Sequence, residues 1–272
     1  MDVTAFRHGQ PGYYSLAELP QRESIEKSAF STGWWELDQI FKFYRGQFVV
    51  VTGIAGHGKS TLMLNILLNM ARKQDIRSFL YVPENEQHLK EKLRGIWNDD
   101  KSFNLFAARQ CFIQSSVPDS YDQAPRTLDW VLERAIKAIE VDGVDIVMID
   151  PWNELERAKP RDMMLSDYIG QCLMSLKQFC RVYSVSVVVI AHPTKAINEN
   201  GGRTPGLADI EGSMNWFNKC DNGLIVVRDA DKNTARVISA KCREIGAGKI
   251  GVCHFHVDPQ TGVFTPQYGA VS

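Results

Sequence analysis

The chain has 272 residues, of which 44% are hydrophobic and 23% are charged, a balance typical of a folded protein with one large domain or two small ones. No run approaches the roughly 18 apolar residues that cross a bilayer, and the first residues lack the apolar core of a signal peptide. The net charge of −1 excludes a surface coated in basic charge for nonspecific nucleic-acid binding, although it is compatible with a local basic channel.

Cysteine spacing gives no sign of a metal site or a disulfide framework. The six cysteines show no paired C-x-x-C spacing. Cys253, His254 and His256 look like metal ligands, but the alternation of residues 252–257 favours a strand. We therefore expect reduced thiols and a cytosol-like compartment, without membrane contact.

The first 29 residues lack the apolar pattern of a segment that belongs to a hydrophobic core. Residues 1–29 are mixed and polar, with prolines at positions 11 and 20, and we expect an arm or linker there. A single globular domain is expected over residues 30–272. Its first elements are an apolar run at 47–52, a glycine-rich turn and a helical stretch at 61–73.

The glycine-rich turn spells a phosphate-binding loop, Gly53-Ile54-Ala55-Gly56-His57-Gly58-Lys59-Ser60. In such a loop glycines let backbone N–H groups point at a phosphate chain, and the next helix offers its positive N-terminus. We expect Lys59 to neutralise the β and γ phosphates and Ser60 to hold Mg²⁺. The predicted nucleotide-binding residues are Gly53, Gly56, Gly58, Lys59, Ser60 and Thr61. A glycine turn that binds nothing is the alternative, and the flanking strand and helix argue against it.

The following elements alternate between strand and helix. Strands are expected at 78–82, 111–113, 144–149 and 185–191, and helices at 86–97, 127–140 and 165–183. This alternation predicts an α/β fold with a mostly parallel, twisted sheet flanked by helices. Three further strands, at 224–227, 235–240 and 251–257, are separated by short turns and predict antiparallel hairpins at one edge of the sheet.

Three predicted strands end in side chains suited to phosphoryl transfer, which needs a held metal and an oriented water. Asp150 is expected to reach the Mg²⁺ shell. Glu84 is the candidate to polarise the attacking water, with Glu86 as the competing choice and a solvated helix-start carboxylate as the alternative. His192 is placed to sense the γ phosphate, although it also suits a capping or packing role.

Two cations lie one residue apart near the end of a predicted hairpin strand. Lys241 and Arg243 would point the same way from a strand. In a single chain they are compatible with a solvated edge, whereas in a ring they would serve as a finger inserted into a neighbouring site.

Several blocks together resemble the RecA-like motor domain of DnaB-like hexameric replicative helicases, within the phage primase-helicase and Twinkle branch. The resemblance spans residues 30–268. Besides the phosphate loop, it rests on the blocks at 33–38, 83–85, 150–154, 191–195, 209–213, 216–223 and 241–243.

The resemblance implies a homo-oligomeric ring, usually of six copies, with Mg²⁺ and ATP or another NTP at the interfaces and single-stranded DNA in the central hole. It implies that Lys241 and Arg243 act in trans and that His192 couples hydrolysis to DNA. Arg228 corresponds to a position that stacks near the nucleotide base, where Arg suits better than Lys. The implied DNA-binding residues are Lys195, Arg203, Asn215 and Lys219.

The resemblance also bears on the wider role of the chain. It implies a primase or polymerase of a replisome as a partner, and a cytoplasm, including that of a phage-infected host, as the location, with the mitochondrial matrix less favoured. Relatives of this branch usually carry a primase or primase-like domain in front of the motor, whereas fewer than 30 residues precede the motor here. We therefore expect no primer synthesis from this chain. The alternative functions are a RecA-like recombinase or loading ATPase that forms filaments on DNA, and a signalling ATPase without a nucleic-acid partner.

Overall fold

The structure is a computed structural model that describes residues 16–18, 24–115, 123–194, 203–212 and 214–271. Within these residues the strands form one nine-stranded sheet in the order β3-β2-β4-β5-β1-β6-β7-β8-β9. The strands are β1 Phe48–Thr52, β2 Ser78–Tyr81, β3 Cys111–Ile113, β4 Ile146–Ile149, β5 Ser186–Ile190, β6 Asn222–Asp229, β7 Thr234–Cys242, β8 Gly251–Val257 and β9 Phe264–Val271. Pairing is parallel from β3 to β6 and antiparallel from β6 to β9.

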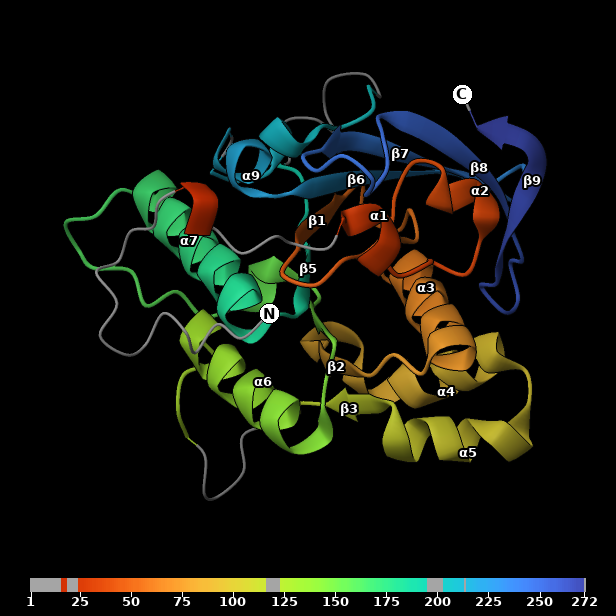
Figure 1. Cartoon of the computed structure of the whole chain (residues 1–272), viewed down its shortest axis with the longest axis horizontal. Helices are drawn as coiled ribbons and strands as arrows, with labels where there is room; N and C mark the ends of the chain where they lie inside the picture. The colour runs from red at the N-terminus through yellow and green to blue at the C-terminus, as the bar shows by residue number, and fades with distance from the viewer. Residues whose placement is uncertain (1–15, 19–23, 116–122, 195–202, 213, 272) are drawn as a thin grey trace.

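Helices cover both faces of the parallel part of the sheet (Figure 1). Helices α3, α4 and α5 contribute to one buried cluster, and α6, α7 and α9 contribute to the other. The helices are α1 Ile25–Ser28, α2 Trp35–Asp38, α3 Lys59–Gln74, α4 Glu86–Trp97, α5 Asp100–Arg109, α6 Leu128–Asp142, α7 Leu165–Tyr183 and α9 Met214–Lys219. None of those in the described part of the chain combines the length and apolar character that a bilayer-spanning helix needs.

Strand β1 shows why its sequence is continuously apolar. Val49 and Val51 belong to the cluster under α3, whereas Phe48 and Val50 belong to the cluster under α6 and α7. Every residue of the strand is buried. A central parallel strand has no solvent face, so both sets of alternate side chains must be apolar.

The predicted α/β fold with antiparallel strands at one edge is confirmed, and helices α4 and α7 cover the predicted residues. Elements that were not predicted include α5, α9 and β9. Helix α5 is capped by Asp99, whose carboxylate accepts the N–H of Lys101, and it buries Phe103 and Phe106. Strand β9 contains Pro266 and Gly269, residues that weaken a strand signal and are tolerated at a sheet edge.

The expected domain boundary near residue 30 stays a prediction. Phe30 forms an isolated antiparallel bridge with Phe43. Most of the predicted arm, residues 1–15 and 19–23, lies outside the described residues. Its role as a linker stays a prediction.

Candidate active site

The parallel register places four strand ends at one edge of the sheet. Val51 of β1 pairs with Ile190 of β5, and Ile149 of β4 pairs with both Val189 and Tyr81. The backbone N–H of Asp150 donates to the carbonyl of Tyr81 at 2.9 Å. The phosphate loop and the residues that follow β2, β4 and β5 therefore share this carboxyl edge.

The predicted phosphate loop lies between β1 and α3, as expected from the sequence. Gly53 has φ 145°, and a Cβ atom there would lie 2.3 Å from the carbonyl oxygen of Val226, so only glycine fits. Gly56 and Gly58 also have positive φ, of 78° and 84°. These conformations favour glycine and are typical of loops whose backbone N–H groups surround an anion.

Lys59 is buried in the mouth of the loop, with a relative exposure of 4%. Its ammonium group donates to the carbonyls of Gly53 and Ile54, at 2.9 and 3.0 Å. Burial lowers the pKa of Lys59 to about 8, against the opposing charges of Asp150 and Glu84. A nearby anion would stabilise the charged form of this buried ammonium group, so the site suits a phosphate chain.

Asp150 is a buried carboxylate with an unused oxygen. Burial raises its pKa to about 6, while a hydrogen bond from Ser60 and the charges of Lys92 and Lys59 act the other way. Oδ2 has no hydrogen-bond partner within the described residues. A lone carboxylate oxygen beside a hydroxyl fits a hard divalent cation, which takes oxygen ligands.

A dedicated metal cage is absent from the described residues, where no group of three or more His, Cys, Asp or Glu side chains converges. Ions such as Mg²⁺ keep several waters and take further ligands from substrate phosphates. Ser60 and Asp150 therefore provide enough protein ligands for a nucleotide-bound ion.

Glu84 and His192 flank the phosphate loop. Glu84 lies in the short 3-10 helix Pro83–Asn85. Burial and the charge of Glu154 raise its pKa, whereas Lys59 lowers it. The half-buried His192 has an Nδ1 atom without a partner in the described chain. Burial and the charge of Lys59 lower the pKa of His192, so its imidazole is neutral near pH 7.

Two charged or titratable groups beside the site were missed in the sequence. Lys92 of α4 is half-buried; burial lowers its pKa and the charge of Asp150 raises it. Its signal was its position three residues after the buried Leu89, on the inward side of a helix. The Nδ1 atom of His57 accepts the backbone N–H of Arg228 at a distance of 3.2 Å. No sequence signal predicted this contact, because His57 occupies a variable position of the loop.

Arg228 lies near the end of β6, beside the phosphate loop. Its Nε atom is buried and has no partner within the described residues. The structure therefore brings Arg228 together with the phosphate loop through its contact with His57, and its role near the nucleotide base stays a prediction.

Lys241 and Arg243 lie at the other end of the sheet. Cys242 pairs with Asn222, and Asn222 pairs with Val49 near the start of β1, whereas the phosphate loop follows the end of β1. Lys241 donates to the carbonyls of Phe217 and Asn218. Arg243 donates to the carbonyl of Asn218 at 2.6 Å and contacts the Asp221 carboxylate at 3.3 Å. Within one chain these cations do not reach the phosphate site.

The predicted DNA-binding residues have varied surroundings. Lys195 lies outside the described residues, as does most of the loop around it. Arg203 is exposed, and its guanidinium forms two bonds to Asp209, of 2.9 and 2.6 Å. The Asn215 amide donates to the carbonyl of Ser166 at 3.0 Å, a contact that holds α9 against α7. Lys219 is half-buried at the end of α9.

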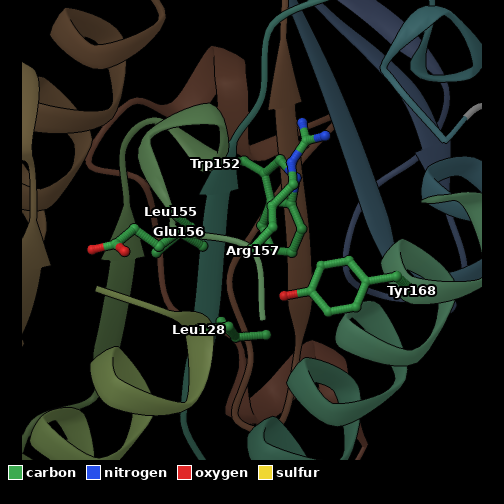
Figure 2. A pocket seen from close by; sticks show the side chains of 6 residues that line it. All are labelled: Leu128, Trp152, Leu155, Glu156, Arg157 and Tyr168. Atoms are coloured by element: carbon green, nitrogen blue, oxygen red, sulfur yellow. The ribbon is translucent and has the colours of Figure 1, made fainter. Parts of the chain in front are cut away.

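The segment after Asp150 packs against α6 and α7. Trp152 and Leu155 are buried, and Tyr168 accepts the N–H of Ala158 at 3.1 Å. These side chains surround a hollow of about 10 Å³, into which Tyr168 points its hydroxyl (Figure 2). That volume suits about one water molecule and excludes a nucleotide.

The same segment also contacts the α9 region. The Trp152 ring meets Trp216 edge to face, with centroids 5.2 Å apart. Arg157 forms an ion pair with Glu211. The end of β4 is thereby connected to the part of the chain that follows the predicted DNA-binding loop.

This edge of the sheet defines a RecA-like P-loop nucleotide-binding domain, in which a glycine loop, a buried lysine and a strand-end carboxylate converge. The match to a family model agrees: residues 37–198 fit the AAA domain model, and the chain belongs to the AAA domain family. Its fold is that of the ATPase domains of DnaB-like helicases. One solved ATPase domain has a TM-score of 0.72 at 21% identity, covering 88% of this chain and 91% of that one.

Other similar proteins include two replicative helicases and a Twinkle homolog. A DnaB-like replicative helicase, described with its interactions with primase, has a TM-score of 0.69 at 21% identity, over 87% of this chain and 61% of that chain. The chloroplastic/mitochondrial Twinkle homolog of Arabidopsis thaliana is 31% identical, over 86% of this chain and 36% of its own length. The replicative helicase DnaB of Mycoplasma genitalium is 20% identical, over 80% and 50%. The chain thus spans half or less of these two curated relatives.

Proposed function

We propose that this chain is the motor domain of a replicative DNA helicase, which hydrolyses ATP or another NTP with Mg²⁺ and moves along single-stranded DNA. The observation that carries the proposal is the incomplete site. Lys59, Ser60 and Asp150 lie together with an unused carboxylate oxygen, while the cations Lys241 and Arg243 lie at the far end of the sheet. Two copies side by side would complete one site.

Each residue contributes a separate part of the chemistry. The loop N–H groups and Lys59 bind and orient the phosphate chain, and Ser60 and Asp150 hold the ion, which neutralises developing charge. Glu84, exposed at the edge of the site, orients the attacking water and accepts its proton. Its raised pKa brings it nearer to the working pH, as a general base requires.

A ring is supported by the surface beside Arg243. The turn between β7 and β8 carries Ile245 and Ile250, which are 98% and 73% exposed. Apolar side chains so exposed next to a cation are typical of a surface that another chain covers. A ring, usually of six copies, would place Arg243 next to the nucleotide held by its neighbour.

The DNA-facing region is proposed from the position of its residues. The chain that follows His192 carries Arg203 and Lys219, which would contact DNA phosphates at the centre of a ring. Lys195, a further candidate, lies outside the described residues. The named interactions of a structural neighbour with primase support a primase as a partner. The DnaB of Mycoplasma genitalium is a replicative DNA helicase by name, which favours unwinding over a filament-forming recombinase.

The test is the rate of NTP hydrolysis with and without single-stranded DNA, measured together with the native mass of the complex. We expect DNA to accelerate hydrolysis in an assembled ring, and Lys59→Ala to reduce hydrolysis to background. A rate indifferent to DNA in an assembled sample, or full activity in the monomer, contradicts the proposal. Imaging on DNA distinguishes a closed ring from an open filament.

A further inference from the structure

His57 joins the phosphate loop to the end of β6. Its Nδ1 atom accepts the backbone N–H of Arg228 at 3.2 Å. The loop also approaches β6 at Gly53, where no side chain fits against the Val226 carbonyl. The loop and the strand end are therefore held together by a close backbone approach and by one side-chain hydrogen bond.

The hydrogen bond fixes the state of the imidazole. Because Nδ1 is an acceptor, the neutral ring carries its proton on Nε2. Burial lowers the pKa of His57, and the charges of Lys59, at the start of α3, and Arg228, on β6, lower it further. The ring is thus neutral near pH 7, and the bond to Arg228 is maintained.

The side chain of Arg228 has a donor without a hydrogen-bond partner among the described residues. This donor, Nε, is buried, and a buried donor without a partner is destabilising. Arg228 lies on β6, on the side of β1 opposite to β5 and β4, whose ends carry His192 and Asp150. Because the ion and the terminal phosphate belong with those two groups, the part of a bound nucleotide nearest to Arg228 is the sugar and base. His57 sets where this side chain begins, because it fixes the backbone of Arg228.

We propose that His57 is a positioning residue for the nucleoside half of the nucleotide: it accepts the Arg228 N–H and thereby holds the Arg228 guanidinium where the sugar and base bind. This inference rests on the proposed function only in assuming that the loop holds a nucleoside triphosphate. His57 acts through Arg228 and not on the reacting phosphate.

The test compares two variants and two ligands. His57→Ala removes the acceptor, whereas His57→Asn keeps an acceptor oxygen close to the place of Nδ1. Dissociation constants are measured for Mg-ATP and for inorganic tripolyphosphate with Mg²⁺. We expect His57→Ala to weaken the binding of Mg-ATP about tenfold, the effect of one lost hydrogen bond. The affinity for tripolyphosphate should stay unchanged. His57→Asn retains wild-type affinity for both.

Two results of this binding comparison overturn the inference. The first is a His57→Ala variant that binds Mg-ATP like wild type. The second is an equal loss for both ligands, which means that the histidine shapes the phosphate loop alone. If Lys59→Ala leaves the affinity for both ligands intact, the proposed function fails whatever His57 does.

A pH series separates positioning from simple packing. A protonated imidazole donates at both nitrogens and cannot accept the Arg228 N–H. The affinity of the wild type for Mg-ATP should therefore fall toward that of His57→Ala as the pH drops below the pKa of His57. Asp150, Glu84 and His192 titrate equally in His57→Asn, so the difference between the two profiles isolates His57. Identical profiles for wild type and His57→Asn overturn the inference.

Discussion

The carboxyl edge of the sheet and the Lys241–Arg243 end differ in how their charged and titratable side chains are satisfied. At the carboxyl edge Asp150, His192 and Arg228 each have a buried atom without a partner among the described residues. At the other end, Lys241 and Arg243 are bonded to carbonyls of the 217–220 segment and to Asp221. One region keeps unused bonding capacity inside the protein, and the other has its charges occupied at the surface.

The difference shows which parts of the site are built in advance. The groups at the carboxyl edge are held rigidly on strand ends, so a ligand meets them already oriented, which lowers the cost of binding. The cations at the other end must exchange their own carbonyl partners for a phosphate from a neighbouring copy. Assembly, and not folding of one chain, would decide whether they act.

The largest expected effect comes from removing the finger. Arg243→Ala should lower the turnover of an assembled ring by about 10³ to 10⁵, the range measured for arginine fingers. Arg243→Lys is the matched control, since it keeps the charge and loses the planar fork. Turnover is measured at saturating NTP, with native mass to confirm assembly.

The same variant tests whether sites are shared. Mixing Arg243→Ala with Lys59→Ala should restore part of the activity, because some interfaces then combine an intact loop with an intact finger. An inactive mixture of co-assembled variants contradicts a finger acting in trans.

The next effect concerns the attacking water. Glu84→Gln should lower turnover by about 10² to 10⁴, the usual contribution of a general base, while nucleotide affinity stays within a few-fold. Glu86→Gln, at the start of the neighbouring helix, is the control and should retain activity. The reverse result would assign the water to Glu86. Single-turnover hydrolysis and binding are measured separately.

A smaller effect tests the buried charge at the carboxyl edge. The folded chain binds a proton at Asp150 more tightly than the unfolded chain does, because burial raises the pKa from 3.8 to about 6. The stability of the nucleotide-free protein should therefore fall as the pH rises from about 4 to about 6. A pKa change of this size corresponds to about 3 kcal/mol. Asp150→Asn should remove this dependence.

Urea unfolding at pH 4 and pH 8 measures that difference. We expect Asp150→Asn to exceed the wild type in stability at pH 8, by up to about 3 kcal/mol, and to resemble it at pH 4. A variant that is less stable at pH 8 would show that the ionised carboxylate is well satisfied, contrary to the view that Asp150 keeps an oxygen without a partner.

The smallest effect is expected at Arg203. Its guanidinium is paired with Asp209, so a DNA phosphate must compete with that carboxylate. Arg203→Ala should weaken the binding of single-stranded DNA only a few-fold. It should also reduce the slope of the logarithm of affinity against the logarithm of salt concentration by about one. Binding titrations at several salt concentrations measure both. An unchanged slope would make Arg203 a purely structural partner of Asp209.

Much of the fold was predictable because local pattern and burial agree. The apolar run at β1 and the inward stripes of α4 and α7 identify their elements. Glycines at 53, 56 and 58 predict the loop because their backbone angles suit few other residues. Helix α5 and strand β9 were missed, since a short helix and an edge strand depend on tertiary contacts more than on pattern.

The sequence by itself determined the order of strand, loop and helix and the residues at the strand ends, because these follow from periodicity and from the narrow chemistry of a phosphate loop. Only the tertiary structure decided which side chains meet. It placed His57 against Arg228, turned Asn215 toward the carbonyl of Ser166, and separated Arg243 from the loop of its own chain. Such contacts join residues far apart in the chain, and their formation depends on which distant strands and loops become neighbours in the sheet, which local periodicity does not specify.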